Sequence, residues 1–163
     1  MSKEKNLIRP DYLYRKGVGA VIINNHNEIF VGKRIDNNSD AWQMPQGGID
    51  NNENEDLAVF REINEETSIS PDKLEIISKS NNYFYYNLPY NLQKKFWGGK
   101  YLGQKQRWYL LKFTGQNQDI NVATDDPEFS DWKWVSRDNI IDSIVEFKRE
   151  MYQQIFNEFS IYL

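Results

Sequence analysis

The 163-residue chain contains no cysteine and only one histidine. The lack of cysteine excludes disulfide bonds, thiolate metal sites and a cysteine nucleophile. The single histidine, His26, lies in the polar run INNHNEIF, which is typical of a hairpin turn. Serine–histidine and multi-histidine zinc chemistry therefore find little support, and we expect His26 to be a solvated loop residue.

Long apolar runs are also missing. The first ten residues, MSKEKNLIRP, lack the apolar core of a signal peptide, and no later stretch is apolar for long enough to span a membrane. The net charge of −4 argues against a surface that is basic throughout, as in proteins that grip long nucleic acids, but it leaves room for a local basic patch. We expect a soluble, cytoplasmic protein with one domain over residues 1–163.

The apolar pattern predicts a sheet with helices on it. Strands are expected at 17–23, 28–34, 106–113 and 131–135, with another starting at Leu74. The stretch 82–99 is aromatic and irregular, which indicates a strand that enters a long loop. Because these strands are interrupted by one central and one C-terminal helix, the fold class predicted is an α/β or α+β sandwich in which helices cover a mixed sheet.

Three helices are predicted. Asn52 or Asn54 caps a central helix that ends near Thr67, and its inward face is expected to carry Leu57, Phe60 and Ile63. Ser136 caps a short helix. Residues 148–159 form a terminal amphipathic helix whose inward side chains are Met151, Ile155, Phe156 and Phe159.

Three glutamates gather on the central helix. Glu62, Glu65 and Glu66 are expected roughly opposite its apolar face, where like charges three and four residues apart weaken a helix by a few tenths of a kcal/mol each. One interpretation is a solvated polar face. The other is a metal site, because Mg²⁺ and Mn²⁺ bind carboxylate oxygens and bridge them to substrate phosphates.

The spacing of these acids resembles a known motif. Gly47, Glu53 and the run REINEETSI that starts at Arg61 are similar to the Nudix box, which asks for a glycine, a glutamate and Arg-Glu-apolar-x-Glu-Glu-x-Gly-apolar at these intervals. Every defined position matches except Ser68, which stands where the family has glycine, at the end of the helix. A left-handed backbone there favours glycine without strictly requiring it.

The resemblance implies a Nudix α/β/α sandwich, with a mixed central sheet, the box helix and a C-terminal helix. It implies that Glu62, Glu65 and Glu66 bind Mg²⁺ or Mn²⁺ and act in catalysis. Gly47 and Gly48 would let the backbone turn tightly and keep the approach to the metal open, with Gly47 at the metal itself. Box residues Glu53 and Arg61 would pair in a structural role. The implied chemistry is hydrolysis of a nucleoside diphosphate linked to another group.

Segments outside the box are similar to one branch of that family. The branch comprises bacterial RNA pyrophosphohydrolases and plant-type asymmetric diadenosine tetraphosphate hydrolases. The segments that resemble it are AWQMPQGGID, YRKGVGAVI, FWGGKYLGQKQRWYLLKF, PEFSDWKWV and VEFKREMY. The branch implies that Glu128 reaches the metals from a loop and acts in catalysis; the alternative is an ordinary loop acid. Trp132 and Trp134, two apart on a strand, are expected in the core.

The same resemblance suggests substrate contacts. Phe147 would stack on a base beside Lys148, although a hydrophobic staple at the helix start explains Phe147 equally well. Arg15 would contact phosphate. The weaker candidates are Arg34, Lys105, Gln106 and Arg107. Two groups of residues have either a binding or a structural role. The first forms either a second stacking surface or part of the core, and consists of Tyr83, Tyr85 and Tyr86. The second forms either a local positive patch or a solvated basic loop, and consists of Lys94, Lys95, Lys100 and Lys105.

The leading expectation is a metal-dependent RNA 5′-pyrophosphohydrolase that acts on 5′-triphosphorylated RNA and also cleaves dinucleoside polyphosphates. The first alternative is a dedicated diadenosine tetraphosphate or pentaphosphate hydrolase. The second, of a different class, is a non-catalytic module that binds nucleotides or RNA ends. DNA and membranes are not expected partners, and the sequence leaves the oligomeric state open.

Overall fold

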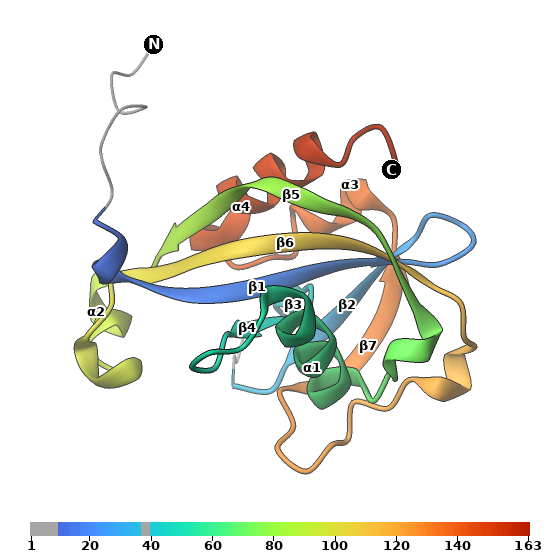
Figure 1. Cartoon of the computed structure of the whole chain (residues 1–163), viewed down its shortest axis with the longest axis horizontal. Helices are drawn as coiled ribbons and strands as arrows, with labels where there is room; N and C mark the ends of the chain where they lie inside the picture. Colours follow the sequence, from blue (N-terminus) through green and yellow to red (C-terminus); the bar gives the residue numbers. More distant parts are fainter. Residues whose placement is uncertain (1–9, 37–39) are drawn as a thin grey trace.

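The computed structural model describes residues 10–36 and 40–163, and the expected α/β/α architecture is confirmed (Figure 1). The strands are β1 (Tyr14–Ile23), β2 (Ile29–Arg34), β3 (Trp42–Gln43), β4 (Gln46–Gly48), β5 (Leu74–Asn87), β6 (Gly103–Phe113) and β7 (Phe129–Val135). The helices are α1 (Glu55–Thr67), α2 (Tyr90–Gln93), α3 (Arg137–Ile140) and α4 (Glu146–Glu158). Short 3₁₀ turns are η2 (Asp11–Leu13), η3 (Pro71–Lys73), η4 (Trp97–Gly99) and η5 (Asn117–Asp119).

The strands form one mixed sheet. Its main path runs β3-β2-β1-β6-β5, while β4 pairs with β1 and β7 with β2. Only β1 and β6 run parallel among the pairs recorded in this sheet, and they stay in register from Tyr14↔Gly103 to Ile23↔Lys112. The prediction of a mixed sheet is confirmed.

Each face of the sheet buries its own core. Along β6 the side chains alternate, so that Trp108 and Leu110 lie in the core under α4, whereas Tyr109 and Leu111 lie in the core under α1. All four are fully buried. The helices α1 and α4 therefore cover opposite faces of the sheet (Figure 1).

The box helix α1 begins and ends as the sequence indicates. The Asn54 side chain accepts hydrogen bonds from the Asp56 and Leu57 amides, as an N-cap does. Ser68 follows the last turn with φ 66°, the left-handed conformation expected at the family's glycine position. The Ser68 hydroxyl donates to the Asn121 carbonyl over 2.7 Å, and the Asn121 amide donates to the Thr67 carbonyl over 2.9 Å. These two bonds fasten the end of α1 to the segment that leads into β7.

The predicted inward face of α1 is partly wrong. Ile63 is fully buried, Phe60 is half-buried, and Leu57 is 65% exposed. In a helix of 3.6 residues per turn, three residues fall 60° short of a full turn. The side chains of Leu57, Phe60 and Ile63 therefore point in directions that differ by 60° per step, and only part of this set can face the core. The inward residues follow a spacing of four and include Val59, Ile63 and Thr67.

The C-terminal helix α4 begins two residues earlier than predicted, and its four expected inward side chains are all buried. Tyr152 joins them, and its hydroxyl accepts a hydrogen bond from the Met44 amide over 2.8 Å. The region 82–99 is more regular than predicted, because β5 continues to Asn87 and α2 and η4 follow. Exposed His26 lies in the β1–β2 turn, as expected.

The aromatic pairs on β7 and β5 have the alternation of strands. Trp132 and Trp134 are half-buried and contact Phe30 with ring centroids 5.8 and 6.0 Å apart, which confirms a packing role. Tyr86 is buried in the core under α4, whereas Tyr83 lies on the opposite side of β5.

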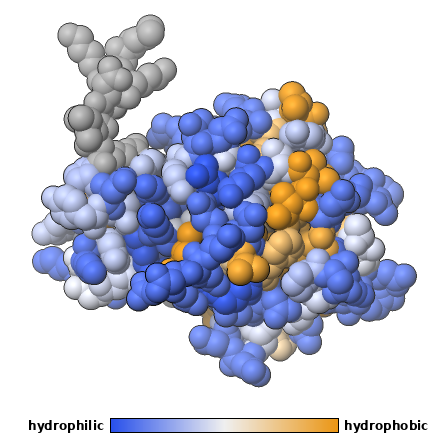
Figure 2. Space-filling model, viewed as in Figure 1, coloured by the Kyte–Doolittle hydropathy of each residue, from blue (hydrophilic) through white to orange (hydrophobic). Residues whose placement is uncertain are grey.

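The surface is mainly polar. Figure 2 shows one face that is largely hydrophilic, with a smaller hydrophobic area right of its centre. None of the helices in the described parts of the chain is long and apolar enough to cross a bilayer.

The two faces of α1 can be tested by truncation. We expect Ile63→Ala to lower the free energy of unfolding by about 2–5 kcal/mol, because it leaves a cavity in a closed core. Leu57→Ala, the matched control on the exposed face, should change it by no more than about 0.5 kcal/mol. Urea unfolding followed by circular dichroism measures both. Equal losses in the two variants would contradict the assignment of the faces.

Candidate active site

A cavity of about 750 Å³ opens beside α1. Its wall includes charged residues from β1, β2, α1 and α4, and apolar residues from the region after β5. The lining residues that matter below are Arg15, Arg34, Gly47, Gly48, Glu62, Glu65, Trp97, Glu128, Phe147 and Lys148. A second hollow of about 540 Å³ shares Glu62, Glu65 and Glu128 with the cavity and adds Glu66. The carboxylates therefore stand between two hollows.

Most of the residues proposed from the sequence meet here. The four glutamates line one hollow or both, and Arg15, Arg34, Phe147 and Lys148 line the larger one. The structure thus brings the anionic box and the proposed cationic and aromatic contacts, which are far apart in sequence, into one connected surface.

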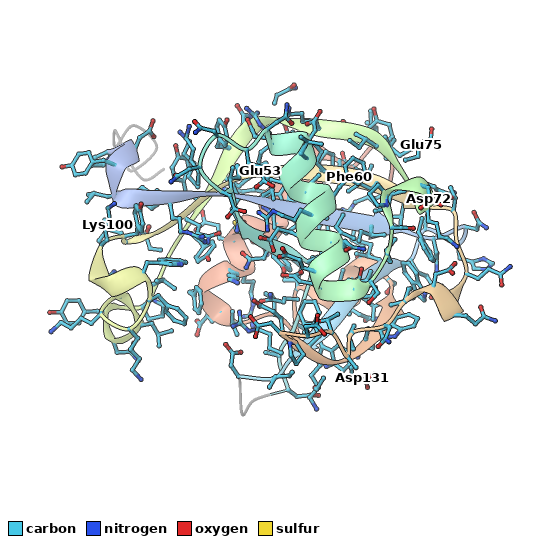
Figure 3. The ribbon with its side chains drawn as sticks, turned by 60° about the horizontal axis from the view of Figure 1, so that its bottom comes forward. Glu53, Phe60, Asp72, Glu75, Lys100 and Asp131 are labelled. Atoms are coloured by element: carbon cyan, nitrogen blue, oxygen red, sulfur yellow. The ribbon has the colours of Figure 1, made fainter. Side chains whose placement is uncertain are left out.

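Arg61 holds the box together. Its Nε and Nη2 donate to the two Glu53 carboxylate oxygens over 2.7 and 2.8 Å, so the expected pairing is present. Nη2 also donates to the Gly48 carbonyl over 2.9 Å, and Nη1 lies 3.0 Å from Glu62 and 3.2 Å from Glu65. In Figure 3 Glu53 lies on the loop beside the first turns of α1. The hydrogen bonds from Arg61 hold the pKa of Glu53 down to about 2.

Glu66 is the most deeply buried acid of the box. It is 2% exposed and lies on the sheet side of the helix, so the prediction that all three glutamates sit opposite the apolar face is wrong. Its Oε2 has no hydrogen-bond partner among the described residues. Burial, together with the nearby Glu62 and Glu128 carboxylates, raises the pKa of Glu66 well above its usual value. A buried acceptor without a partner is costly, so this oxygen is suited to a cation.

Glu62 packs directly against the backbone of Gly47. A Cβ added to Gly47 would lie 2.1 Å from the Glu62 carboxyl carbon, so any other residue would displace that side chain. The predicted tight turn is wrong, because Gly47 and Gly48 belong to β4 and pair in extended conformation with Val18 and Gly17. Burial is the main reason why the pKa of Glu62 rises to about 7, despite the opposing effect of Arg61.

Arg15 lies close to the backbone of β4 and to an aromatic ring. A Cβ added to Gly48 would lie 2.1 Å from the Arg15 Nη1, and the Arg15 guanidinium carbon lies 5.6 Å from the Trp97 ring centroid. A cation–π contact of this length fixes the direction of the side chain. Sequence reasoning did not single out Trp97; its place in an aromatic stretch free of acids was the available signal.

Lys148 and Phe147 line the cavity from the start of α4. Lys148 is 3% exposed; its Nζ donates to the Gln43 side chain over 3.3 Å and lies 4.9 Å from the Tyr86 ring centroid. Burial, with a smaller effect from Arg34, lowers the pKa of Lys148 to about 7. The ring of half-buried Phe147 is tilted against that of Tyr86, with ring centroids 5.9 Å apart, and Phe147 also lines the cavity.

The Arg34 guanidinium already has two side-chain partners within the protein. Its Nε donates to Asp36 over 2.7 Å and its Nη1 to Gln43 over 3.2 Å. Asp36 is a further lining residue that the sequence did not indicate.

Three weaker candidates lie away from the cavity. Lys105 is 8% exposed and forms an ion pair with Asp11 at 3.2 Å, so it does not belong to an exposed basic patch. Gln106 is fully buried within the sheet, where it bonds to Gln46 and Gln104. Arg107 pairs with Glu55. Alternation along β6 turns Lys105 and Arg107 to the face opposite Gln104, which lines the cavity. Gln106 shares the face of Gln104 but is buried and hydrogen-bonded to it, so it does not reach the lining.

The acids suit a hard divalent cation by their chemistry, although no ready cage exists. Within residues 10–36 and 40–163, no three acidic or histidine side chains converge closely enough to hold an ion as they stand. Arg61 instead draws the Glu62 and Glu65 carboxylates towards itself. The free Glu66 oxygen and the Glu62 carboxylate that packs on Gly47 still fit a metal held by oxygen ligands, once Glu65 turns from Arg61.

The fold and the box together define the class of protein. The NUDIX domain family matches residues 13–155, and the chain belongs to this family. Among curated relatives, the RNA pyrophosphohydrolase of Rickettsia conorii is 49% identical over 158 residues, covering 97% of this chain and 95% of the relative. The RNA pyrophosphohydrolase of Roseobacter denitrificans is 43% identical over 150 residues, covering 92% and 94%.

Solved structures agree on the fold. The E. coli dihydroneopterin triphosphate pyrophosphohydrolase aligns with a TM-score of 0.69 at 20% identity, covering 87% of this chain and 96% of that one. A C. elegans Ap4A hydrolase binary complex aligns with a TM-score of 0.62 at 19% identity, covering 90% and 99%.

Gly47→Ala tests the close approach to Glu62. The added methyl should displace the Glu62 carboxylate and weaken Mn²⁺ binding about 10–100-fold while the fold persists. Isothermal titration with Mn²⁺ measures the affinity, and the double variant Gly47→Ala/Glu62→Ala is the control. If the displacement is the cause, the double variant should bind no worse than Glu62→Ala alone. Full additivity would contradict it.

Glu53→Gln tests the pairing with Arg61 through pH. The pKa of Glu53 is lowered on folding from 4.5 to about 2, so its stabilising contribution is present above pH 4.5 and is lost as the pH falls towards 2. We expect the unfolding free energy of the wild type to exceed that of the variant at pH 6, and the gap to close between pH 4.5 and 2. Urea titrations across this range measure the gap. A constant gap would argue against the pairing.

Proposed function

We propose that this Nudix protein is an Mg²⁺- or Mn²⁺-dependent RNA 5′-pyrophosphohydrolase, which removes pyrophosphate from 5′-triphosphorylated RNA and leaves a 5′-monophosphate. The observation that carries the proposal is one continuous cavity lined by carboxylates, by the cations Arg15, Arg34 and Lys148, and by the aromatic ring of Phe147. The curated relatives that bear the name RNA pyrophosphohydrolase support the choice of RNA.

The cations act on the polyphosphate. Arg15, whose guanidinium lies against Gly48, would donate to phosphate oxygens, and Arg34 and Lys148, which line the same cavity, would add positive charge. Lys148 is poised to be protonated when an anion binds, since its pKa of about 7 reflects its burial. Phe147 would stack on a base, a contact that gives affinity with little preference for sequence.

The carboxylates would hold the metal. Glu62, Glu65, Glu66 and Glu128 supply the oxygens, together with the backbone at Gly47. A divalent cation, when bound, neutralises phosphate charge and lowers the pKa of the attacking water. Glu128, on a loop whose position is fixed by a hydrogen bond from the Ile35 amide to its carbonyl over 3.1 Å, is our candidate for accepting the proton of that water.

Dinucleoside polyphosphates are the second candidate substrate. Several aromatic rings line the cavity, Phe147 and Trp97 among them, and more than one ring would suit a substrate with a base at each end of a phosphate chain. The absence of cysteine is compatible with a reducing cytoplasm, where we expect either substrate to be met.

The two substrates can be separated by one comparison. We expect kcat/KM for a triphosphorylated oligoribonucleotide to exceed that for diadenosine tetraphosphate under a single Mg²⁺ concentration. Glu66→Gln, the control, should lower both by at least about 100-fold with an unchanged circular dichroism spectrum, because it removes an oxygen ligand for the metal. A higher value for the dinucleotide would favour the second candidate. Binding without any phosphate release would favour a non-catalytic module.

A further inference from the structure

The charges of the chain are unevenly distributed. Residues 76–118 contain seven lysines and arginines and no aspartate or glutamate, although the whole chain carries 24 acidic residues and a net charge of −4. An acid-free stretch of this kind creates a local positive field on a protein that is otherwise acidic.

Part of that positive charge is already neutralised. Lys79 pairs with Asp56, Lys105 with Asp11 and Arg107 with Glu55. The remaining cations that are exposed lie together in the segment 88–101, and they are Lys94, Lys95 and Lys100. In the described parts of the chain, none of these three has an acidic partner within 4.0 Å.

Aromatic rings are interleaved with these lysines. Lys94 lies 5.5 Å from the Tyr90 ring centroid and Lys100 lies 5.3 Å from that of Tyr101. Tyr90 is 76% exposed and Phe96 is 37% exposed. Exposed rings beside unpaired cations are the combination that binds single-stranded nucleic acid, since bases stack on the rings while the backbone meets the charges.

The segment is also a wall of the proposed active site. Leu92, Phe96 and Trp97 line the cavity, so the lysines lie on the outer side of that wall. Figure 3 shows Lys100 at one end of the molecule, on the segment after α2 and across from α1. A chain leaving the cavity on this side would meet the lysines next.

The backbone of the segment is well fixed. The Leu88 amide donates to the Leu102 carbonyl over 2.8 Å, and the Leu102 amide donates to the Leu13 carbonyl over 2.8 Å. The Gln93 side chain donates to the Leu88 carbonyl over 3.0 Å. The backbone that carries the lysines is therefore fixed by hydrogen bonds where β5 ends and where β6 and β1 begin. A backbone that is already ordered reduces the entropic cost of binding.

We propose that segment 88–101 binds the RNA chain beyond its first 5′ nucleotides, through Lys94, Lys95 and Lys100, and so makes the enzyme prefer longer RNA over dinucleotides. This inference rests on the proposed function. A dinucleoside polyphosphate has no phosphate backbone outside the cavity, and it gains nothing from these lysines.

The test is the triple variant Lys94→Gln/Lys95→Gln/Lys100→Gln. For a triphosphorylated RNA of about 20 nucleotides, losing three backbone contacts should reduce the slope of log affinity against log salt by about 2. Between 50 and 200 mM salt, the wild type should therefore lose about 20-fold more affinity than the variant. The kcat/KM for diadenosine tetraphosphate should be unchanged.

The matched control is Lys112→Gln/Lys133→Gln/Arg137→Gln, which removes the same charge elsewhere on the molecule from cations that also have no acidic partner within 4.0 Å in the described parts of the chain. It should retain the wild-type salt slope. An equal change of slope in the control would show long-range steering alone and overturn the proposal, as would an unchanged slope in the test variant.

Direct binding separates this inference from the proposed function. Fluorescence anisotropy with a 5′-monophosphorylated RNA of the same length needs no hydrolysis. Weaker binding by the test variant supports the surface even if the wild type releases no pyrophosphate, which would refute only the catalytic proposal. If the variant binds RNA normally but no longer binds vesicles with 30% phosphatidylserine, the surface belongs to a membrane and the proposal is overturned.

Discussion

The shared hydrogen bonds of Arg61 are the interaction on which the site depends. A single guanidinium meets Glu53, Glu62, Glu65 and the Gly48 carbonyl, so it joins the loop, the helix and β4 at one point. It also offsets much of the repulsion among the box acids that the sequence alone leaves unexplained. Only Glu66 lacks such compensation, and its buried, unpartnered oxygen marks where added positive charge is most strongly favoured.

Close packing of β4 against its neighbours determines how the site is shaped. Two charged groups, the Glu62 carboxylate and the Arg15 guanidinium, rest on the bare backbone of Gly47 and Gly48. A carboxylate and a guanidinium therefore approach adjacent residues of the same strand, and both line the same cavity. A polyphosphate with bound cations requires both kinds of group within a short span.

The features predicted well from the sequence were local ones. Asn54, Ser68 and the Glu53–Arg61 pair are set by spacings within one helix and its flanking loop. The wrong predictions concern the side of a helix or strand on which a side chain lies. Leu57 was misplaced because a spacing of three drifts around a helix, and Lys105 was misplaced because strand alternation decides which side chains reach a cavity. The parallel pairing of β1 with β6 has no local signal, since it arises from contacts between remote segments. The burial of Glu66 was missed with the helix face, because Glu66 follows Val59 and Ile63 by seven and three residues on the inward side.

Ser68 has a mechanical consequence. Glycine would relax the left-handed backbone at this position, but it could not supply the hydroxyl that reaches Asn121. With serine, two adjacent residues at the end of α1, Thr67 and Ser68, are both bonded to Asn121, where the segment leading to Glu128 begins. The helix that bears three of the glutamates and the segment that carries the fourth therefore share one anchoring point, at Asn121.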